Sequence, residues 1–171
     1  MIKIILLTLL ILPVTTFSQT MSVKVYFSSE KFNPGSLDCS KVFPVTRKIP
    51  KTKSVAKAAL EELFKGVTKT EAANGYYSFF SDATKSILIS VKVKKGMAYV
   101  NLKHEVIEKL GNATTTCGGG AFDAQLEKTL KQFPSIKKIF FAIEGNPEDY
   151  YEWMQIVDCP KELKNCSGKD F

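Results

Sequence analysis

The most reactive side chains in the sequence belong to a cysteine and to the only histidine. His104 precedes Cys117, and a thiol beside an imidazole can act as a nucleophile with its base. The sequence shows no third group that would orient the imidazole. Because the chain also contains Cys39, Cys159 and Cys166, we favour a disulfide over catalysis for Cys117. This pair therefore predicts no catalytic residue.

A group of acidic and aromatic residues near the end of the chain indicates a different chemistry. The acidic members are Glu144, Glu148, Asp149, Glu152 and Asp158, and the aromatic members are Tyr150, Tyr151 and Trp153. Paired carboxylates beside an aromatic sugar-binding surface are typical of glycan hydrolases. However, acids in the first turn of a helix complement its dipole, and a single aromatic face usually packs on a core. We predict a non-enzymatic protein and keep a secreted glycan hydrolase as the alternative.

Two further ligand patterns are incomplete. The glycines at 118–120 precede an expected helix, whose first N–H groups can hold an anion. A phosphate-binding loop also needs a lysine followed by serine or threonine, whereas Ala121, Phe122 and Asp123 follow here. We interpret the glycines as a flexible joint. One histidine and four cysteines without a CxxC spacing do not form a tetrahedral set, so we predict neither a metal nor a cofactor.

Basic side chains are the strongest candidates for binding. The net charge is +7, and a basic balance favours anionic partners. The candidate residues are Arg47, Lys48, Lys92, Lys94 and Lys95. We expect an envelope protein or an anionic cell-wall polymer as the partner and no specific nucleic acid. Whether the two basic groups share one face depends on the fold.

The four cysteines have three ways to form two disulfides. Cys159 and Cys166 flank a short segment that contains Pro160, which favours a local bridge and leaves Cys39 to pair with Cys117. The second bridge would close a separation of 78 residues and contribute roughly 4 kcal/mol in the chain-entropy model. The other two pairings stay open.

Hydrophobic periodicity predicts the elements that position these residues. Expected strands occupy 22–28, 42–49, 86–93, 97–102 and 136–144, and expected helices occupy 54–66, 104–110 and 121–133. A further helix should begin after Asn146, with Pro147 at its first position. The main order is β-β-α-β-β-α-β, and the strands at 86–93 and 97–102 should form a hairpin with Gly96 in the turn. We therefore predict a single small α+β domain at 22–145, followed by a helical, cysteine-containing extension at 146–171.

The first residues have the pattern of a signal peptide. Lys3 supplies a charged start, residues 4–13 are almost entirely apolar, and small or polar residues follow. The apolar run is roughly half of the ~20 residues that a spanning helix needs, so we expect no stable membrane anchor. Thr16 and Ser18 suit a cleavage site after Ser18. Removal of residues 1–18 takes away Lys3 and no acid, which leaves a charge of +6 on a secreted or periplasmic protein.

Four segments carry a recognisable pattern. They are VTRKIP at 45–50, AALEELFKGVTKTE at 58–71, KKGMAYVNL at 94–102 and LEKTLKQFPSIKKIFFAIEG at 126–145. In this order they resemble the GerMN domain, a module named from spore-germination and sporulation proteins. The chain departs from the family where Gly66, Val67 and Thr68 replace a common Gly-Pro-Thr, and where residues 146–171 are extra.

The resemblance implies a fold and a class of function. It implies a compact twisted sheet with two main helices packed on one face, to which this chain adds its helical tail. It also implies a binding or assembly module of the cell envelope, in a sporulation or germination role, without known catalysis. The family supplies no agreed ligand residues, so none is carried over.

The leader gives the first testable prediction. The exported protein should begin near Gln19, because the apolar run is too short to remain as an anchor. Intact-mass analysis of the exported protein measures this directly. A mass that includes residues 1–18 would contradict the prediction.

Overall fold

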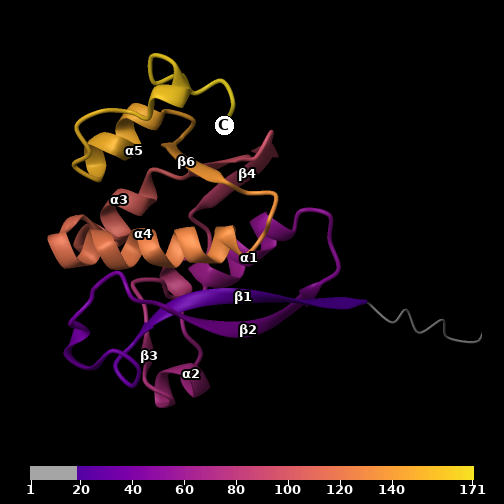
Figure 1. Ribbon diagram of the computed structural model, residues 1–171, viewed down its shortest axis with the longest axis vertical. Helices are drawn as coiled ribbons and strands as arrows, with labels where there is room; N and C mark the ends of the chain where they lie inside the picture. The colour runs from indigo at the N-terminus through magenta and orange to yellow at the C-terminus, as the bar shows by residue number, and fades with distance from the viewer. Residues whose placement is uncertain (1–18) are drawn as a thin grey trace, which may run out of the picture.

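The computed structural model describes residues 19–171, and the predicted signal peptide lies outside them. The strands are β1 (Thr20–Ser29), β2 (Phe43–Pro50), β3 (Tyr76–Tyr77), β4 (Leu88–Lys94), β5 (Met97–Leu102) and β6 (Lys138–Ile143). The α-helices are α1 (Val55–Phe64), α2 (Lys69–Ala73), α3 (Glu105–Lys109), α4 (Thr116–Lys131) and α5 (Pro147–Trp153). Single 3-10 turns are η1 (Pro34–Ser36), η2 (Asp82–Thr84), η3 (Gly111–Thr114) and η4 (Lys161–Leu163). Figure 1 shows their arrangement. The predicted α+β class and the order of the main elements are confirmed.

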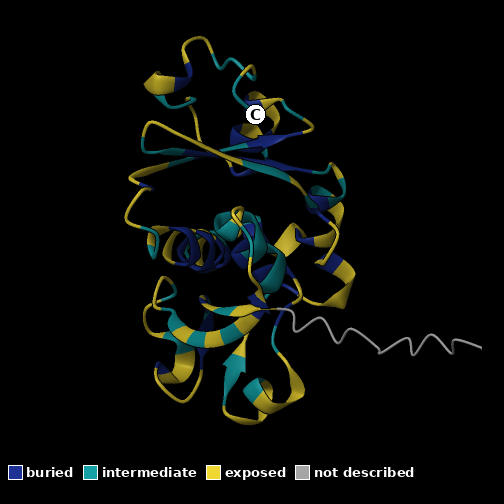
Figure 2. Ribbon diagram, turned by 90° about the vertical axis from the view of Figure 1, so that its right-hand side faces the viewer, coloured by how far each residue is buried: buried dark blue, intermediate teal, exposed yellow. Residues whose placement is uncertain are grey.

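The strands form two sheets of three strands each. In the first sheet the order is β2-β1-β3, with β1 antiparallel to both neighbours. In the second sheet the order is β4-β5-β6, where β4 and β5 form the predicted hairpin and β6 runs parallel to β5. The long helices α1 and α4 lie between the two sheets (Figures 1 and 2).

The division into two sheets corrects the expectation of a single sheet with both helices on one face. The reason lies at the second edge of β1, which is occupied by a helix. The Lys24 N–H donates to Gln132 Oε1 at 2.8 Å, and the Tyr26 N–H donates to Thr129 Oγ1 at 3.2 Å. Because Thr129 of α4 and Gln132 just after it use these groups, no strand of the second sheet can pair with β1 there.

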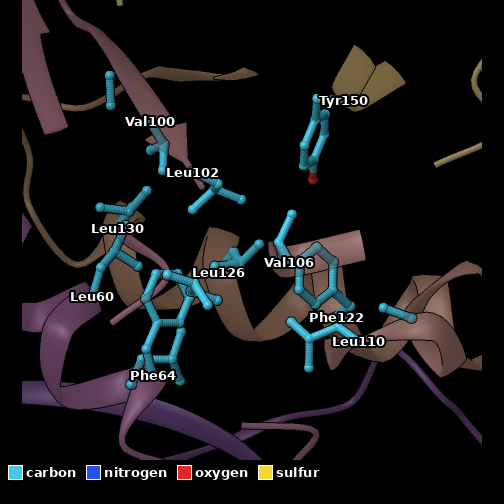
Figure 3. Packing of buried hydrophobic residues seen from close by; sticks show 14 of the residues in the cluster. Leu60, Phe64, Val100, Leu102, Val106, Leu110, Phe122, Leu126, Leu130 and Tyr150 are labelled. Carbon is cyan, nitrogen blue, oxygen red and sulfur yellow. The ribbon is translucent and has the colours of Figure 1, made fainter. Parts of the chain in front are cut away.

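The main hydrophobic core lies around α1 and α4 and joins the two sheets. Side chains of α4 meet those of α1 on one side and of β5 on the other, as Figure 3 shows. The labelled members are Leu60, Phe64, Val100, Leu102, Val106, Leu110, Phe122, Leu126, Leu130 and Tyr150. A helix that packs on two sides needs apolar residues around most of its circumference, and α4 meets this requirement over its central turns.

Helix α4 begins earlier than the sequence predicts and includes the three glycines. Thr115 caps the helix by accepting a hydrogen bond from the Gly118 N–H at 3.1 Å. A Cβ atom on Gly118 would lie 2.0 Å from the Asn112 carbonyl oxygen. Glycine is therefore required by a close backbone approach, and the interpretation of this run as a flexible joint is wrong.

The extension beyond residue 145 packs on both sides of the second sheet: α5 lies beside β6 and contacts α4, whereas the residues up to Phe171 cover the face of β5 that lies away from α1 and α4. Asn146 caps α5 by accepting from the Glu148 N–H at 3.1 Å, with Pro147 at the first position. Near the end of the chain the Phe171 ring packs edge-on against Tyr99 of β5, with centroids 5.5 Å apart. Both faces of β5 are therefore buried.

Arg47 holds β2 to the first two helices from inside the protein. Its side chain is 9% exposed, and its guanidinium donates to both carboxylate oxygens of Glu71 at 3.2 and 2.5 Å. It also donates to the carbonyl oxygens of Glu62 and Gly66, both at 2.6 Å, and lies 5.2 Å from the centre of the Phe27 ring. The structure therefore does not place Arg47 among surface residues that could bind a partner.

Glu71 depends on this arginine. Burial raises the pKa of the Glu71 carboxyl, but hydrogen bonds from Arg47 and from the Thr68 N–H outweigh burial and hold the pKa below its usual range. The same carboxylate completes the cap of α2, because Thr68 and Glu71 form a capping box. One guanidinium thus connects a strand, the end of α1 and the start of α2.

Replacement of Arg47 should destabilise the fold, whereas replacement of its neighbour should not. Arg47→Met leaves the Glu71 carboxylate without its partner, and we expect a loss of about 3 kcal/mol in the free energy of unfolding. Lys48→Met, on the exposed face of β2, is the matched control and should change it by less than about 0.5 kcal/mol. Urea denaturation at neutral pH measures both values. Equal effects of the two substitutions would contradict this account.

Candidate binding site

The β4–β5 hairpin and the C-terminal extension together form a basic hollow. We use this name for the depression of about 410 Å³ that is lined by Lys94, Lys95, Met97, Tyr99, Glu162, Leu163, Lys164, Ser167, Lys169 and Asp170. Tyr99 and Met97 lie on β5, and the four lysines come from the hairpin and from the extension. The basic hollow lies on the side of the second sheet that faces away from the helices.

Ion pairs neutralise part of this charge. Lys94 Nζ lies 3.2 Å from Asp170 Oδ1, and Glu162 pairs with Lys138 of β6. Among the ion pairs of residues 19–171, none involves Lys95, Lys164 or Lys169. Three positive charges around one depression therefore have no acidic neighbour within salt-bridge distance, and the hollow is suited to an anionic group.

The geometry of the hairpin explains where its lysines point. Lys95 and Gly96 form a two-residue turn with φ of 51° and 80°, as the primed hairpin turns require. In antiparallel pairing, Lys92 lies opposite Tyr99 and Lys94 opposite Met97, so both lysines share the face of Tyr99. Lys92 Nζ there contacts the Phe171 carbonyl oxygen.

The structure separates the two basic groups that the sequence predicts. Lys92, Lys94 and Lys95 belong to the second sheet, whereas Lys48 lies on the exposed face of β2 in the first sheet. The sequence analysis missed Lys164 and Lys169, which join the hairpin lysines in the basic hollow. No local signal reveals them, because only the fold of the extension brings them back to β5.

A family match covers most of the chain. Residues 24–149 match the family called Germane, which is described as sporulation and spore germination. The chain belongs to this family. The resemblance to the GerMN domain that the sequence predicts is thereby confirmed. Comparison with curated proteins finds no match.

Solved structures of related domains are similar at low identity. The tandem GerMN domains of the sporulation protein GerM from Bacillus subtilis are 23% identical, with a TM-score of 0.47, over 74% of this chain and 40% of that chain. A proposed lipoprotein from Clostridium perfringens is 18% identical, with a TM-score of 0.43, over 73% of this chain and 75% of that chain. The first GerMN domain of GerM is 20% identical, with a TM-score of 0.39, over 73% and 84%. This chain thus spans less than half of the tandem structure.

The Germane match divides the basic hollow. Lys94 and Lys95 lie inside the matched residues, whereas Lys164 and Lys169 lie in the extension beyond residue 149. One disulfide lies inside the family domain and the other lies in the extension. Cys159 is bonded to Cys166 within the extension, and Cys39 is bonded to Cys117, which ties the β1–β2 loop to the first turn of α4. This is the pairing that the sequence favours.

Cys117 and the two tyrosines have structural roles, whereas three of the acidic candidates, Glu148, Glu152 and Asp158, line an open hollow of about 790 Å³. Cys117 is in a disulfide, so no thiol lies beside His104. The backbone N–H of His104 donates to Glu144 Oε1 at 3.1 Å. Tyr150 is 1% and Tyr151 is 7% exposed, so neither forms an open surface for sugar stacking. The Germane family is not a known enzyme family. Within residues 19–171, no group of three metal-ligating side chains is present, and no helix is long and apolar enough to span a membrane.

A second hollow of about 450 Å³ runs between α4, β6 and the extension. Asp123 and Glu127 line it from α4, and Tyr150 and Tyr151 line it from α5. Asp123 is exposed as a residue, but protein atoms surround its carboxyl group closely. Loss of hydration and the negative charge of Glu127 therefore raise the pKa of the Asp123 carboxyl to about 6. Both acids lie one turn apart on one helix, and Glu127 pairs with Lys131. They therefore do not flank a substrate from two sides as glycan hydrolysis requires.

The raised pKa of Asp123 predicts a pH dependence of stability. Its pKa in the folded protein is about 6, against an ordinary value of 3.8, so the unfolded chain loses its proton first as pH rises. This contribution to stability is complete below about pH 4 and is lost as pH rises through about 6. We expect Asp123→Asn to raise the unfolding free energy at pH 7 by about 1 kcal/mol, a value reduced for solvent screening of a partly exposed group.

Urea denaturation at pH 4 and pH 7 checks this prediction. The two proteins should differ at pH 7 and have equal stability at pH 4. Asp82→Asn, at a carboxylate that is 89% exposed, is the control and should show no such difference. A pH-independent effect of Asp123→Asn would contradict the assigned cause.

Proposed function

We propose that the protein is a non-enzymatic binding module that works outside the cytoplasm, at the cell envelope, in sporulation or spore germination. Its ligand is an anionic group of a wall polymer or of a protein partner, which it holds in the basic hollow. The observation that carries this proposal is the convergence of Lys95, Lys164 and Lys169, without acidic partners, around one depression of about 410 Å³.

The floor of the basic hollow supports binding of a ligand with both charge and apolar surface. Tyr99 is 5% exposed and stacks against Phe140 and Phe171 at centroid distances of 5.6 and 5.5 Å. These aromatic contacts keep the floor rigid, while the lysine side chains above it adapt to the ligand. Lysine is a flexible point charge, so it suits a repeating anion better than a planar, bidentate one.

The proposed location rests on the disulfides and on the family. Disulfides persist in oxidising compartments, and all four cysteines of this chain are in disulfides. The Germane family is described by sporulation and spore germination, processes in which the cell envelope is rebuilt. A predicted leader at 1–18 agrees with export.

Charge reversal in the basic hollow should weaken binding to purified wall fragments. We expect Lys164→Glu with Lys169→Glu to lower affinity by about tenfold, because each lysine contributes an exposed attraction of about 0.5–1 kcal/mol. Binding of the unmodified protein should also weaken between low and moderate salt, since exposed charges are screened over about 8 Å at physiological ionic strength. Titration by calorimetry at two salt concentrations measures both effects.

The matched control moves the same charge change to the other sheet. Lys24→Glu with Lys48→Glu gives the same net charge on exposed positions of β1 and β2 and should leave affinity within about twofold. Equal losses in both double variants would show a response to net charge alone. Affinity that does not change with salt would rule out the electrostatic site.

A further inference from the structure

Three strand edges in this fold are blocked, by prolines, by side chains of α4 and the residue after it, and by the extension. The free edge of β2 carries Pro44 and Pro50, which lie opposite Tyr26 and Thr20. The Tyr26 N–H points away from β2 toward α4. Because facing residues of such a pair both direct their backbone groups outward, Pro44 and Pro50 would present their backbone nitrogens at the free edge of β2. Proline has no N–H to offer there. The second edge of β1 is occupied by Thr129 and Gln132, as described above. Such features prevent unwanted strand pairing.

The outer edge of β6 is closed by the extension. Ile143 and Asn146 exchange backbone hydrogen bonds of 3.0 and 2.8 Å where α5 begins. Helix α5 then packs against β6, with the Tyr150 ring stacked on Phe141 at a centroid distance of 4.7 Å. Little of this edge is accessible to another chain.

The edge of β4 is different. It ends the sheet β4-β5-β6, and no backbone group of residues 19–171 outside β5 hydrogen-bonds to it. Lys94 and Met97 close the two-residue turn, so Lys94 and Lys92 exchange their backbone bonds with β5. The N–H and C=O groups of Val91 and Val93 therefore point away from β5, toward the open edge of the sheet; Figure 1 labels the strand β4.

The two faces beside this edge offer different side-chain environments. On the face toward the helices, a hollow of about 310 Å³ is lined by Val91, Val93, Val55, Ala56, Phe133 and their neighbours. Val93 is 45% exposed at its mouth. On the opposite face, the ammonium groups of Lys92 and Lys94 extend from the same strand.

We propose that β4 receives an extended acidic segment of a partner protein as a fourth strand. The segment would bond through its backbone to Val91 and Val93, place small apolar side chains in the hollow beside α1, and place acidic side chains against Lys92 and Lys94. Recognition by strand addition works in this way, with backbone bonds for affinity and alternate side chains for specificity. The inference rests on the proposed binding role and names the partner: a protein segment that alternates apolar and acidic residues.

The charge of the strand argues against a second copy of this chain as the occupant. Two β4 strands paired edge to edge would bring Lys92 and Lys94 of each copy onto one face, and like charges in facing positions of a sheet are destabilising. A wall polymer without a peptide backbone cannot pair with the outward N–H and C=O groups. An acidic peptide pairs with the outward backbone groups, and its carboxylates replace the ion pair of Lys94 with Asp170 and add to the contact of Lys92 with the Phe171 carbonyl oxygen.

The test uses a synthetic peptide of about seven residues that alternates glutamate and valine, a usual strand length. Val93→Pro removes one outward N–H without touching the bonds to β5, and we expect it to lower peptide affinity by about tenfold, the equivalent of one backbone bond. Val93→Thr keeps the N–H and the β-branched shape at a site that is 45% exposed, so affinity should remain within about threefold. Thermal unfolding of each variant checks that the fold is retained.

A second measurement does not depend on any variant. In the unmodified protein, the amide protons of Val91 and Val93 should exchange with solvent at least about tenfold more slowly when the peptide is bound. The amides of Lys92 and Lys94, already bonded to β5, serve as internal controls. Unchanged exchange at Val91 and Val93 would overturn the proposal.

The remaining outcomes separate this inference from the proposed function. Equal binding of a peptide with the same composition in separate glutamate and valine blocks would overturn strand addition, and so would a concentration-dependent dimer that Val93→Pro abolishes. Val93→Pro should leave the binding of wall fragments within about twofold, because Val93 does not line the basic hollow. Loss of wall binding in Lys164→Glu with Lys169→Glu, together with no effect of Val93→Pro on the peptide, would retain the basic hollow and reject the β4 site.

Discussion

The packing of α4 between two sheets is the interaction on which the rest of the structure depends. Its Phe122, Leu126 and Leu130 side chains are fully buried, and each such side chain contributes about 1.5–3 kcal/mol when it leaves water. Because α4 occupies the second edge of β1, the remaining strands must form a separate sheet. The same helix anchors the β1–β2 loop through Cys117 at its first turn.

The second sheet acquires the proposed binding surface from the extension. Without residues 154–171 the outer face of β5, including Tyr99, would be open to solvent; with them it becomes a buried floor under a rim of lysines. Ion pairs from Asp170 and Glu162 to the two strands keep the extension in place, although exposed pairs of this kind are individually weak. The bridge between Cys159 and Cys166 restricts the loop that carries Lys164.

Positive charges have different roles in this protein according to their depth. Arg47 uses four of its five N–H groups in bonds inside the protein, whereas Lys48, one residue later, faces solvent because side chains alternate along a strand. The Germane family match identifies the domain. Which basic side chains are accessible to a partner is decided by how deeply each side chain is buried in the fold.

The sequence alone determined the main elements, their order and the family, because hydrophobic period, turn residues and helix breakers act over short distances; it did not reveal α2 or β3. Even the local hairpin turn at Lys95–Gly96 and the cap at Asn146 were predictable. Tertiary structure decided the number of sheets, the burial of Arg47 and the meeting of Lys94 and Lys95 with Lys164 and Lys169. Half of the candidate site was thus visible in the sequence. The other half was not, since strand pairing, and with it the face that each charge occupies, depends on contacts between residues far apart in the chain, which carry no local pattern.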